Sequence, residues 1–244
     1  MTAKLAFLLL THLGAAVPFG VVVTTLYGGD VDIRAEGSGN IGATNVVRLY
    51  GWKLGGWALG LDVLKGFVPV LLARLLWPDA GIFWWGAVAL WAFLAHCFPV
   101  YLAFRGGKGV ATGAGGLLAL SPHVTVPAVG VWVTIVAMTG RSSLGALGSV
   151  ISVVALAWFL MPELLPVVAA LAMGIVVTHT PNIRRLIRGE EKQVVKPVRW
   201  ARGSEEQSDA QAVLAQGPGG GVAAPGVWKE TEDPLVSEEP LEGP

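Results

Sequence analysis

Residues 5–27 read LAFLLLTHLGAAVPFGVVVTTLY, an almost uninterrupted apolar run in which only His12 and Pro18 stand out. The run is 23 residues long. A helix needs about 20 residues to cross the roughly 30 Å of hydrocarbon in a bilayer. Because the run exceeds that length, it predicts a membrane-spanning helix near the start of the chain.

Further apolar runs lie at residues 54–77, 82–104, 114–138, 144–160 and 164–178. The third of these is broken at Ser121-Pro122, and proline ends or kinks a helix. The chain is 53% hydrophobic and 14% charged, with a mean hydropathy of +0.61, whereas soluble domains carry about 25% charged residues. We therefore expect an all-α integral membrane protein, a seven-helix bundle with about five full spans and two short or re-entrant helices.

Lysine and arginine cluster in alternate loops. Of the 15 basic residues in positions 1–199, 12 lie in four segments: residues 28–53, 104–113, 139–143 and 179–199. The remaining turns, residues 78–81 and 161–163, hold none. Basic loops stay in the cytoplasm, so we expect the N-terminus outside and the C-terminus cytoplasmic. The segment between residues 113 and 141 then forms two short helices hinged near Pro122, or a re-entrant hairpin shielded by its neighbours.

The formal net charge of zero hides two opposite parts. Residues 1–199 carry 15 basic and 8 acidic side chains, whereas residues 200–244 carry 2 and 9. The run from Gly217 to Gly226 contains five glycines and two prolines. Such composition is typical of disorder. We expect a membrane-embedded domain over residues 1–199 and a disordered acidic tail over residues 200–244.

The polar segment after the first apolar run contains GSGNIGATNVVR at residues 37–48. Its glycines allow tight turns that direct backbone N–H groups towards a ligand. A helix beginning near Ala43, capped by Ser38 or Asn40, would offer further N–H groups to an anion. Arg48 falls about one turn further along that helix. We interpret this segment as half of a phosphate-binding site at the membrane surface.

Gly37, Gly39 and Gly42 also match the glycine pattern of dinucleotide-binding domains, with Asp62 at a separation of 20 residues. That pattern has meaning only between a strand and a helix of a βαβ unit. Here the preceding run is long enough to cross a bilayer, and Asp62 lies inside the next apolar run. The sequence therefore favours a phosphate site on membrane helices over a nicotinamide site.

Two further polar segments carry similar chemistry: residues 105–113 read RGGKGVATG, and residues 179–191 read HTPNIRRLIRGEE. Glycines beside Lys108 suit close approach of backbone and ammonium to an anion. The basic loops together supply Arg48, Lys108, Arg141, His179 and Arg185. Such a set binds phosphate and has enough donors for two anionic groups. Acidic residues are scarce, which disfavours a carboxylate metal site.

The three segments resemble the motifs of the integral-membrane, acyl-phosphate-dependent glycerol-3-phosphate acyltransferases of bacteria. Residues 37–48 match the first motif. The second is matched by Gly106, Gly107, Lys108, Gly109 and Thr112, and the third by His179, Asn182, Ile183, Arg185, Leu186, Gly189 and Glu191. Residues 62–66 and Arg141-Ser142 are also similar to family positions. The resemblance covers about residues 5–192 and leaves the tail outside it.

The resemblance implies a reaction. An acyl group moves from acyl phosphate, supplied by the bilayer, to the 1-hydroxyl of sn-glycerol-3-phosphate from the cytosol. The products are lysophosphatidic acid and phosphate, and this is the first acylation step of bacterial phospholipid synthesis. We expect a monomer in the bacterial inner membrane, in contact with membrane lipid, with its active site on the cytoplasmic side. We expect no cofactor, no metal and no nucleic-acid partner.

Specific roles follow as hypotheses. We expect Ser38, Lys108 and His179 to act in catalysis. The expected substrate-binding residues are Gly39, Asn40, Gly42, Thr44, Asn45, Arg48, Gly106, Gly107, Gly109, Thr112, Arg141, Ser142, Asn182, Arg185 and Glu191. Lys108 or a glycine N–H would stabilise the carbonyl oxyanion. The base is either His179 or the acyl phosphate itself, and we favour the substrate-assisted reaction over a serine nucleophile.

Other interpretations remain open. An anion transporter could use the broken helix at Ser121-Pro122, although the polar segments lie on one face and the halves show no repeat. A phosphoalcohol transferase lacks its paired aspartate motifs here. Asp62 and Lys65 are close enough to pair inside the second apolar run, as a structural pair or as support for the site. We interpret His12, His96 and His123 as structural.

Overall fold

The computed structural model describes residues 1–27 and 31–195. The acidic tail that the sequence predicts from residue 200 onward lies outside the described residues. Within the described ranges the chain forms nine α-helices and three short 3-10 helices, and it contains no strand. The βαβ unit that a nicotinamide site requires is therefore absent from this part of the chain.

The helices have the following bounds. The α-helices are α1 (Thr2–Ala15), α2 (Phe19–Leu26), α3 (Ala43–Leu76), α4 (Gly81–Cys97), α5 (Val110–Leu120), α6 (Pro122–Thr139), α7 (Ser142–Leu160), α8 (Leu165–Thr178) and α9 (Thr180–Ile187), and the 3-10 helices are η1 (Pro78–Ala80), η2 (Val100–Leu102) and η3 (Pro162–Leu164). The predicted helix start near Ala43 is confirmed. Gly51, with a φ of 80°, interrupts α3 and separates its first two turns from the long remainder.

The first apolar run is not one straight helix. α1 ends at Ala15, α2 begins at Phe19, and their axes bend by 44°. Pro18 precedes α2 and has no N–H with which to continue α1. At the bend, the carbonyl of Val17 accepts a hydrogen bond of 2.8 Å from Lys65 Nζ. The prediction of a single 23-residue helix is therefore wrong, because a proline and a buried lysine stabilise a break.

By length and apolar composition, three helical segments are candidates to cross a membrane: Pro78–Leu102, α6 and α7. The number becomes five when the bent pairs α1–α2 and α8–α9 each count as one span. Counting each of these two pairs once reduces the nine α-helices of the described residues to seven helical elements. The predicted break near Pro122 is confirmed between α5 and α6. The number of complete spans stays a prediction.

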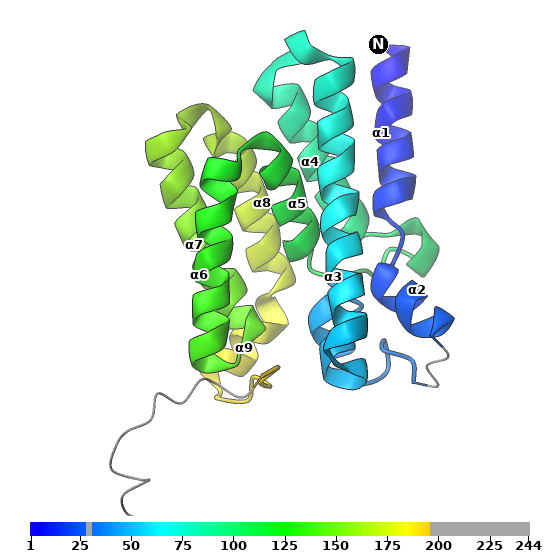
Figure 1. Cartoon of the computed structure of the whole chain (residues 1–244), viewed down its shortest axis with the longest axis vertical. Helices are drawn as coiled ribbons and strands as arrows, with labels where there is room; N and C mark the ends of the chain where they lie inside the picture. The colour runs from blue at the N-terminus through cyan, green and yellow to red at the C-terminus, as the bar shows by residue number, and fades with distance from the viewer. Residues whose placement is uncertain (28–30, 196–244) are drawn as a thin grey trace, which may run out of the picture. The chain divides into compact units, whose positions relative to one another are not determined.

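Helix α5 lies between two groups of helices (Figure 1). It packs against α3 and α4 on one side and against α6 and α8 on the other. Two glycines allow the close approach of α3 and α5. A Cβ at Gly66 would lie 2.0 Å from the carbonyl oxygen of Thr112, and one at Gly115 would lie 2.0 Å from that of Val63. Small residues allow the same close approach between helices in membrane bundles.

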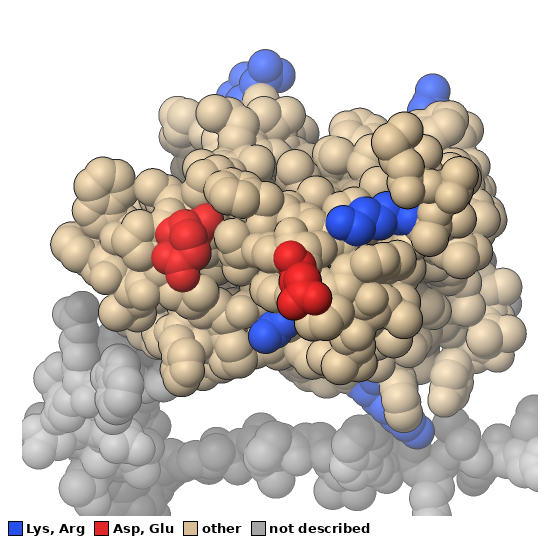
Figure 2. Space-filling model, turned by 90° about the horizontal axis from the view of Figure 1, so that it is seen from above, with Lys and Arg blue, Asp and Glu red and all other residues tan. Residues whose placement is uncertain are grey.

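Two of the polar segments, the loop before α3 and the segment around α9, lie at the end of the bundle away from the N-terminus (Figure 1). Lys192 Nζ contacts the carbonyl of Gly37 at 3.2 Å, and Lys108 donates to Asn182. The opposite end is viewed in Figure 2, where few charged side chains interrupt a mostly uncharged surface. The polar segments thus come together in the fold, and their common position on one face of the membrane stays a prediction.

Candidate active site

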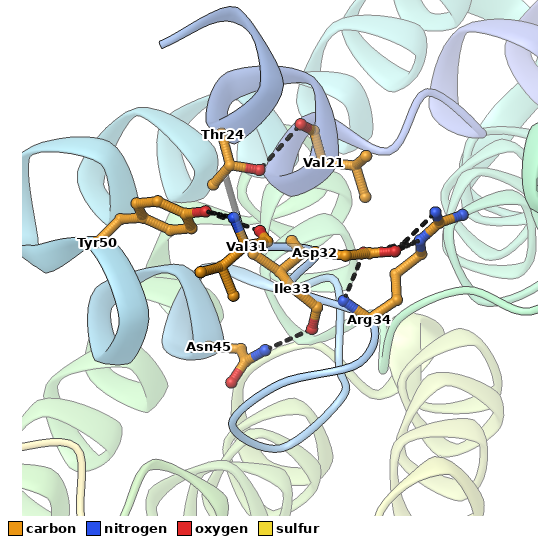
Figure 3. A network of polar contacts seen from close by, with 8 residues as sticks. All are labelled: Val21, Thr24, Val31, Asp32, Ile33, Arg34, Asn45 and Tyr50. Carbon is orange, nitrogen blue, oxygen red and sulfur yellow. Dashed lines mark hydrogen bonds and ion pairs between the residues drawn. The ribbon is translucent and has the colours of Figure 1, made fainter. Parts of the chain in front are cut away.

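The loop before α3 is fastened to the first turns of that helix (Figure 3). The Tyr50 hydroxyl accepts a hydrogen bond from the Val31 N–H at 3.0 Å and donates one to the Val31 carbonyl at 2.7 Å. Asn45 Nδ2 donates to the carbonyls of Ile33 and Glu36 at 2.8 and 3.1 Å. These contacts place the glycine-rich part of the loop over the start of α3.

Asn45 is the centre of this arrangement and is 1% exposed. Its Oδ1 accepts hydrogen bonds from the Ser38 N–H at 2.9 Å and from Arg48 Nη1 at 3.3 Å. A side-chain amide has two N–H donors and two acceptor lone pairs, and the four contacts of Asn45 match that capacity. The structure thus uses Asn45 to place Ser38 and Arg48. A direct contact between Asn45 and a substrate stays a prediction.

The N-terminus of α3 has no side-chain cap. Gly42 occupies the N-cap position, and no side-chain oxygen accepts from the first turn. The prediction that Ser38 or Asn40 caps this helix is therefore wrong, because the N-cap position falls on a glycine that has no side chain. An N-terminus whose N–H groups are not satisfied by a cap retains the donors and partial positive charge that favour an anion.

The loop around Lys108 folds back on the end of α4. The N–H groups of Gly106 and Gly107 donate to the carbonyls of Cys97 and His96, both at 3.1 Å. Gly109 is the N-cap of α5 and has a φ of 77°, a conformation that favours glycine. The Thr178 hydroxyl donates to the carbonyl of Lys108 at 3.1 Å, which joins the loop to α8.

Glu191 organises the third segment. It accepts hydrogen bonds from the Ser143 hydroxyl at 2.7 Å, from Asn182 Nδ2 at 2.6 Å and from Arg185 Nε at 2.6 Å. The carboxylate accepts only, so it orients the Asn182 amide with Nδ2 towards Glu191. The oxygen of Asn182 consequently faces Lys108, which donates to it.

Three helix N-termini converge on the site, because α3, α5 and α7 begin at Ala43, Val110 and Ser142. Residues from all three first turns line one cavity of about 290 Å³. The cavity carries dipoles that favour negative charge as well as the cationic side chains. Arg141, just before α7, donates through Nε to the carbonyl of Glu191 at 3.2 Å.

The cavity brings together most of the predicted residues. Its lining includes Ser38, Asn40, Gly42, Thr44, Arg48, Lys108, Gly109, Ser142, His179, Asn182 and Glu191. The predicted residues outside this lining are Gly39, Asn45, Gly106, Gly107, Thr112, Arg141 and Arg185. Several of the latter hold lining residues in place, as Asn45 and Arg185 do. Their roles as substrate contacts stay predictions.

Asp62, His96 and Ser143 line the cavity as well, although sequence reasoning assigned none of them to substrate. His96 stands in an apolar run, where a buried histidine gives no sign of function. Ser143 adjoins a predicted residue, but its bond to Glu191 spans 48 positions. For Asp62 the signal was its charge inside a predicted span, which usually indicates a role in the bundle interior.

The remainder of the cavity wall is largely apolar. It is formed by side chains of α3, α5, α6, α7 and α8, among them Leu59, Leu117, Trp132, Val153 and Leu171. The polar part lies at the helix ends, and the apolar part extends between the helices. The cavity therefore suits a ligand with an anionic head and a hydrocarbon chain.

Burial sets the charge states at the polar end. It lowers the pKa of Lys108 to about 8, helped by the charges of Arg185 and Arg48 against that of Glu191. Burial also lowers the pKa of His179 to about 4, and the charge of Lys108 adds to this effect. His179 Nδ1 lies 2.8 Å from the Ile175 carbonyl. Because a carbonyl only accepts, Nδ1 carries the proton of the neutral ring and Nε2 keeps a lone pair.

The pKa values of Glu191 and Arg48 are both lowered, but for different reasons. Burial opposes ionisation of Glu191, but hydrogen bonds from Ser143, Asn182 and Arg185 outweigh it and lower the pKa of the carboxyl. Burial lowers the pKa of Arg48, but the group stays protonated because guanidinium is by far the most basic side-chain group. Among the described residues, no three His, Cys, Asp or Glu side chains lie close enough to hold a metal ion.

The fold and the cavity define a helical membrane protein with a cation-lined site at one end. The chain belongs to the glycerol-3-phosphate acyltransferase family, whose model matches residues 5–189. The predicted family is thereby confirmed.

Similar proteins agree with this assignment. A glycerol-3-phosphate acyltransferase of Syntrophotalea carbinolica is 44% identical over 195 residues, covering 79% of this chain and 98% of the relative. One of Myxococcus xanthus is 44% identical over 190 residues, covering 77% and 98%. Among solved structures, PlsY, an integral membrane glycerol 3-phosphate acyltransferase in its glycerol 3-phosphate form, has a TM-score of 0.73 and 34% identity over 78% of this chain and 95% of that one. Its lysophosphatidic acid form has a TM-score of 0.72 and 33% identity, over the same shares. The predicted all-α integral membrane class is confirmed.

Proposed function

We propose that this protein transfers an acyl group from acyl phosphate to the 1-hydroxyl of sn-glycerol-3-phosphate, giving lysophosphatidic acid and phosphate. One observation carries the proposal: a cavity lined by Lys108, Arg48 and His179 at the helix ends continues into an apolar wall between the helices. Family membership and the glycerol 3-phosphate and lysophosphatidic acid forms of PlsY support it.

Different residues bind the phosphate of glycerol-3-phosphate and the head of the acyl phosphate. Glycerol-3-phosphate is held by Arg48, Lys108, His179 and Asn182, since arginine pairs with phosphate oxygens and lysine acts as a point charge. The acyl phosphate is held by hydroxyls and backbone N–H groups where α3 and α7 begin, with Ser38, Thr44 and Ser142 as the side-chain donors. Its hydrocarbon chain lies along the apolar wall and enters from the bilayer.

The chemistry needs no protein nucleophile. The 1-hydroxyl oxygen forms a bond to the acyl carbon, the bond from that carbon to the phosphate oxygen breaks, and the hydroxyl proton ends on the departing phosphate. Lys108 stabilises the oxyanion that forms in between. His179, neutral with a lone pair on Nε2, accepts the hydrogen bond that orients the attacking hydroxyl. The acyl phosphate, which has basic oxygens of its own, is the final proton acceptor.

The distribution of basic residues also gives the orientation of the protein in the membrane. The basic loops are cytoplasmic, so the N-terminus is outside, the C-terminus is cytoplasmic, and the cavity opens to the cytosol at the inner membrane. The protein acts as a monomer without cofactor. The transporter alternative rests on the break at Ser121-Pro122, and neither residue belongs to the cavity lining in the described part of the chain.

The choice of donor tests the proposal. The full-length protein, purified in detergent, is supplied with glycerol-3-phosphate and either palmitoyl phosphate or palmitoyl-CoA. We expect lysophosphatidic acid only from the phosphate donor. Turnover of palmitoyl-CoA at an equal or higher rate would contradict the proposed donor, and binding of glycerol-3-phosphate without turnover of either donor would favour a transporter.

A further inference from the structure

A chain of buried polar side chains runs from the bend in the first span towards the loop that carries Lys108. Lys65 Nζ donates to the Val17 carbonyl at 2.8 Å and pairs with Asp62 Oδ1, also at 2.8 Å. His96 Nδ1 lies 3.7 Å from the same carboxylate oxygen. Asp62, Lys65 and His96 are 2%, 7% and 4% exposed. Polar groups inside an apolar bundle thus join α3 and α4 to the bend between α1 and α2.

His96 extends this chain to the glycine loop in two ways. Its carbonyl accepts the N–H of Gly107 at 3.1 Å. Its ring lies directly against the Cα of Gly107, because a Cβ at that position would stand only 2.1 Å from His96 Nε2. The backbone just before Lys108 therefore rests on the imidazole, and the position of that ring is set by the network around Asp62.

Stability does not explain a buried ion pair of this kind. Removing both charges from water is costly, and replacing such a pair by apolar side chains of similar volume is often neutral or stabilising. Ionisable groups inside membrane bundles also tend to serve function. Asp62 and His96 line the same cavity as Lys108. The network of Asp62, Lys65 and His96 is therefore in direct contact with the candidate active site.

We propose that Asp62, Lys65 and His96 are positioning residues, which hold the Gly106–Lys108 loop so that the Lys108 ammonium stays beside Asn182. They act through Lys108 and touch no substrate. The proposal rests on the proposed acyl transfer only for the assignment of Lys108 to the reaction. The placement of the loop itself can be measured separately.

The first test removes both charges together, with Asp62→Leu and Lys65→Met in one chain. We expect the thermal unfolding midpoint to stay unchanged or rise, while kcat falls about 10- to 100-fold, the cost of a displacement of about 1 Å in an active site. A merely structural pair predicts the reverse, a lower midpoint with kcat per folded molecule retained. That reverse result, or an unchanged kcat, would overturn the proposal.

A second test uses the contact between ring and loop, and it decides the matter if the double variant does not fold. Gly107→Ala alone collides with the imidazole, so we expect a loss of kcat. His96→Ala creates the missing space but also removes the ring that supports the loop. We therefore expect Gly107→Ala to cost at least about tenfold less kcat in a His96→Ala chain than in the wild type, through coupling of two touching residues. His12→Ala is the matched control, since His12 lies against Trp91, away from the cavity. Equal losses from Gly107→Ala in the two backgrounds would contradict the proposal.

Hydrogen–deuterium exchange separates this proposal from the proposed function. Exchange is measured at the amides of residues 103–109 in the wild type and in the Asp62→Leu, Lys65→Met chain. We expect faster exchange in the variant, because the loop loses its support. If the wild type does not turn over acyl phosphate and the variant still exchanges faster, the proposed function fails and the positioning network stands. Unchanged exchange overturns the network whatever the activity.

Discussion

The hydroxyl of Thr44 lies 3.1 Å from the hydroxyl of Ser142, although the two residues are 98 positions apart in the chain. Thr44 belongs to the first turn of α3, and Ser142 begins α7. The contact therefore joins two helix N-termini at the cavity wall. Such termini attract anions through free N–H groups and the helix dipole, so the hydroxyl pair marks where we place the acyl phosphate head.

Removing either hydroxyl should weaken acyl phosphate binding. For Thr44→Val and Ser142→Ala we expect the KM of palmitoyl phosphate to rise about tenfold, since a hydrogen bond to a charged group contributes about 1.5–3 kcal/mol. In the double variant the loss of binding free energy should be smaller than the sum of the losses in the two single variants, because the two hydroxyls share one contact. Steady-state kinetics at saturating glycerol-3-phosphate measures this. A KM unchanged in both single variants would move the acyl phosphate head elsewhere.

The affinity for glycerol-3-phosphate should depend on pH through Lys108. Its pKa is lowered from the ordinary value of 10.5 to about 8, chiefly by burial. Only the protonated amine attracts phosphate, so the contribution of Lys108 to affinity is constant below about pH 8, and above that pH the affinity falls by up to about tenfold per pH unit. Titration calorimetry between pH 6 and 10 measures the change.

Lys108→Arg is the control for that titration. Guanidinium stays protonated over the whole range, so the decline in affinity above about pH 8 should disappear. The lowered pKa of Lys108 also affects stability, and there the dependence on pH has the opposite direction to that of the affinity. Between about pH 8, the pKa of Lys108 in the folded chain, and pH 10.5, its ordinary pKa, the unfolded chain binds more protons than the folded one. The contribution of Lys108 therefore makes the free energy of unfolding rise with pH. An affinity that falls equally in wild type and Lys108→Arg would refute the assignment.

His179 tests whether the protein or the substrate accepts the proton. Because its pKa is about 4, the ring stays neutral, and kcat should show no titration of His179 between about pH 5 and 8. If the substrate is the base, His179→Gln raises the KM of glycerol-3-phosphate and lowers kcat by no more than about tenfold, below the usual 10²–10⁴-fold effect of a general base. A loss of kcat far beyond the loss of affinity would make His179 the base.

Asn45→Asp tests how the first loop is held. The substitution keeps the shape but turns the donor into an acceptor that faces the carbonyls of Ile33 and Glu36. We expect a loss of about 1–3 kcal/mol in the free energy of unfolding, the cost of unsatisfied buried groups, and lower activity because Ser38 and Arg48 shift. Asp32→Asn removes the exposed ion pair with Arg34 and should leave the free energy of unfolding and the activity nearly unchanged. Equal effects of the two variants would count against the role of Asn45.

Local chemistry made several features predictable from the sequence. Proline placed the break before α6, and the glycine-rich segment placed the start of α3 at Ala43. The charges of Asp62 and Lys65, three residues apart, predicted a pair that the structure contains. Each of these depends on residues that are close together in the chain.

Features that depend on distant partners were not predictable. Pro18 alone does not say that the first apolar run bends, because the bend is stabilised by Lys65, 48 positions away from Val17. Ser38 looked like a helix cap, but Asn45 takes its N–H. His96 resembled a structural histidine until the fold placed Gly107 against its ring. Such juxtapositions are set by helix packing and leave no local pattern.

Acyl transfer is measured from parallel time courses of the phosphate and lysophosphatidic acid that the protein forms from palmitoyl phosphate and glycerol-3-phosphate. Lys108→Met removes a half-buried ammonium at the cavity, and Lys53→Met removes an exposed one outside its lining. We predict equal amounts of both products, abolished by the first substitution and retained with the second. Phosphate release without lysophosphatidic acid, or full activity of Lys108→Met, would contradict the account.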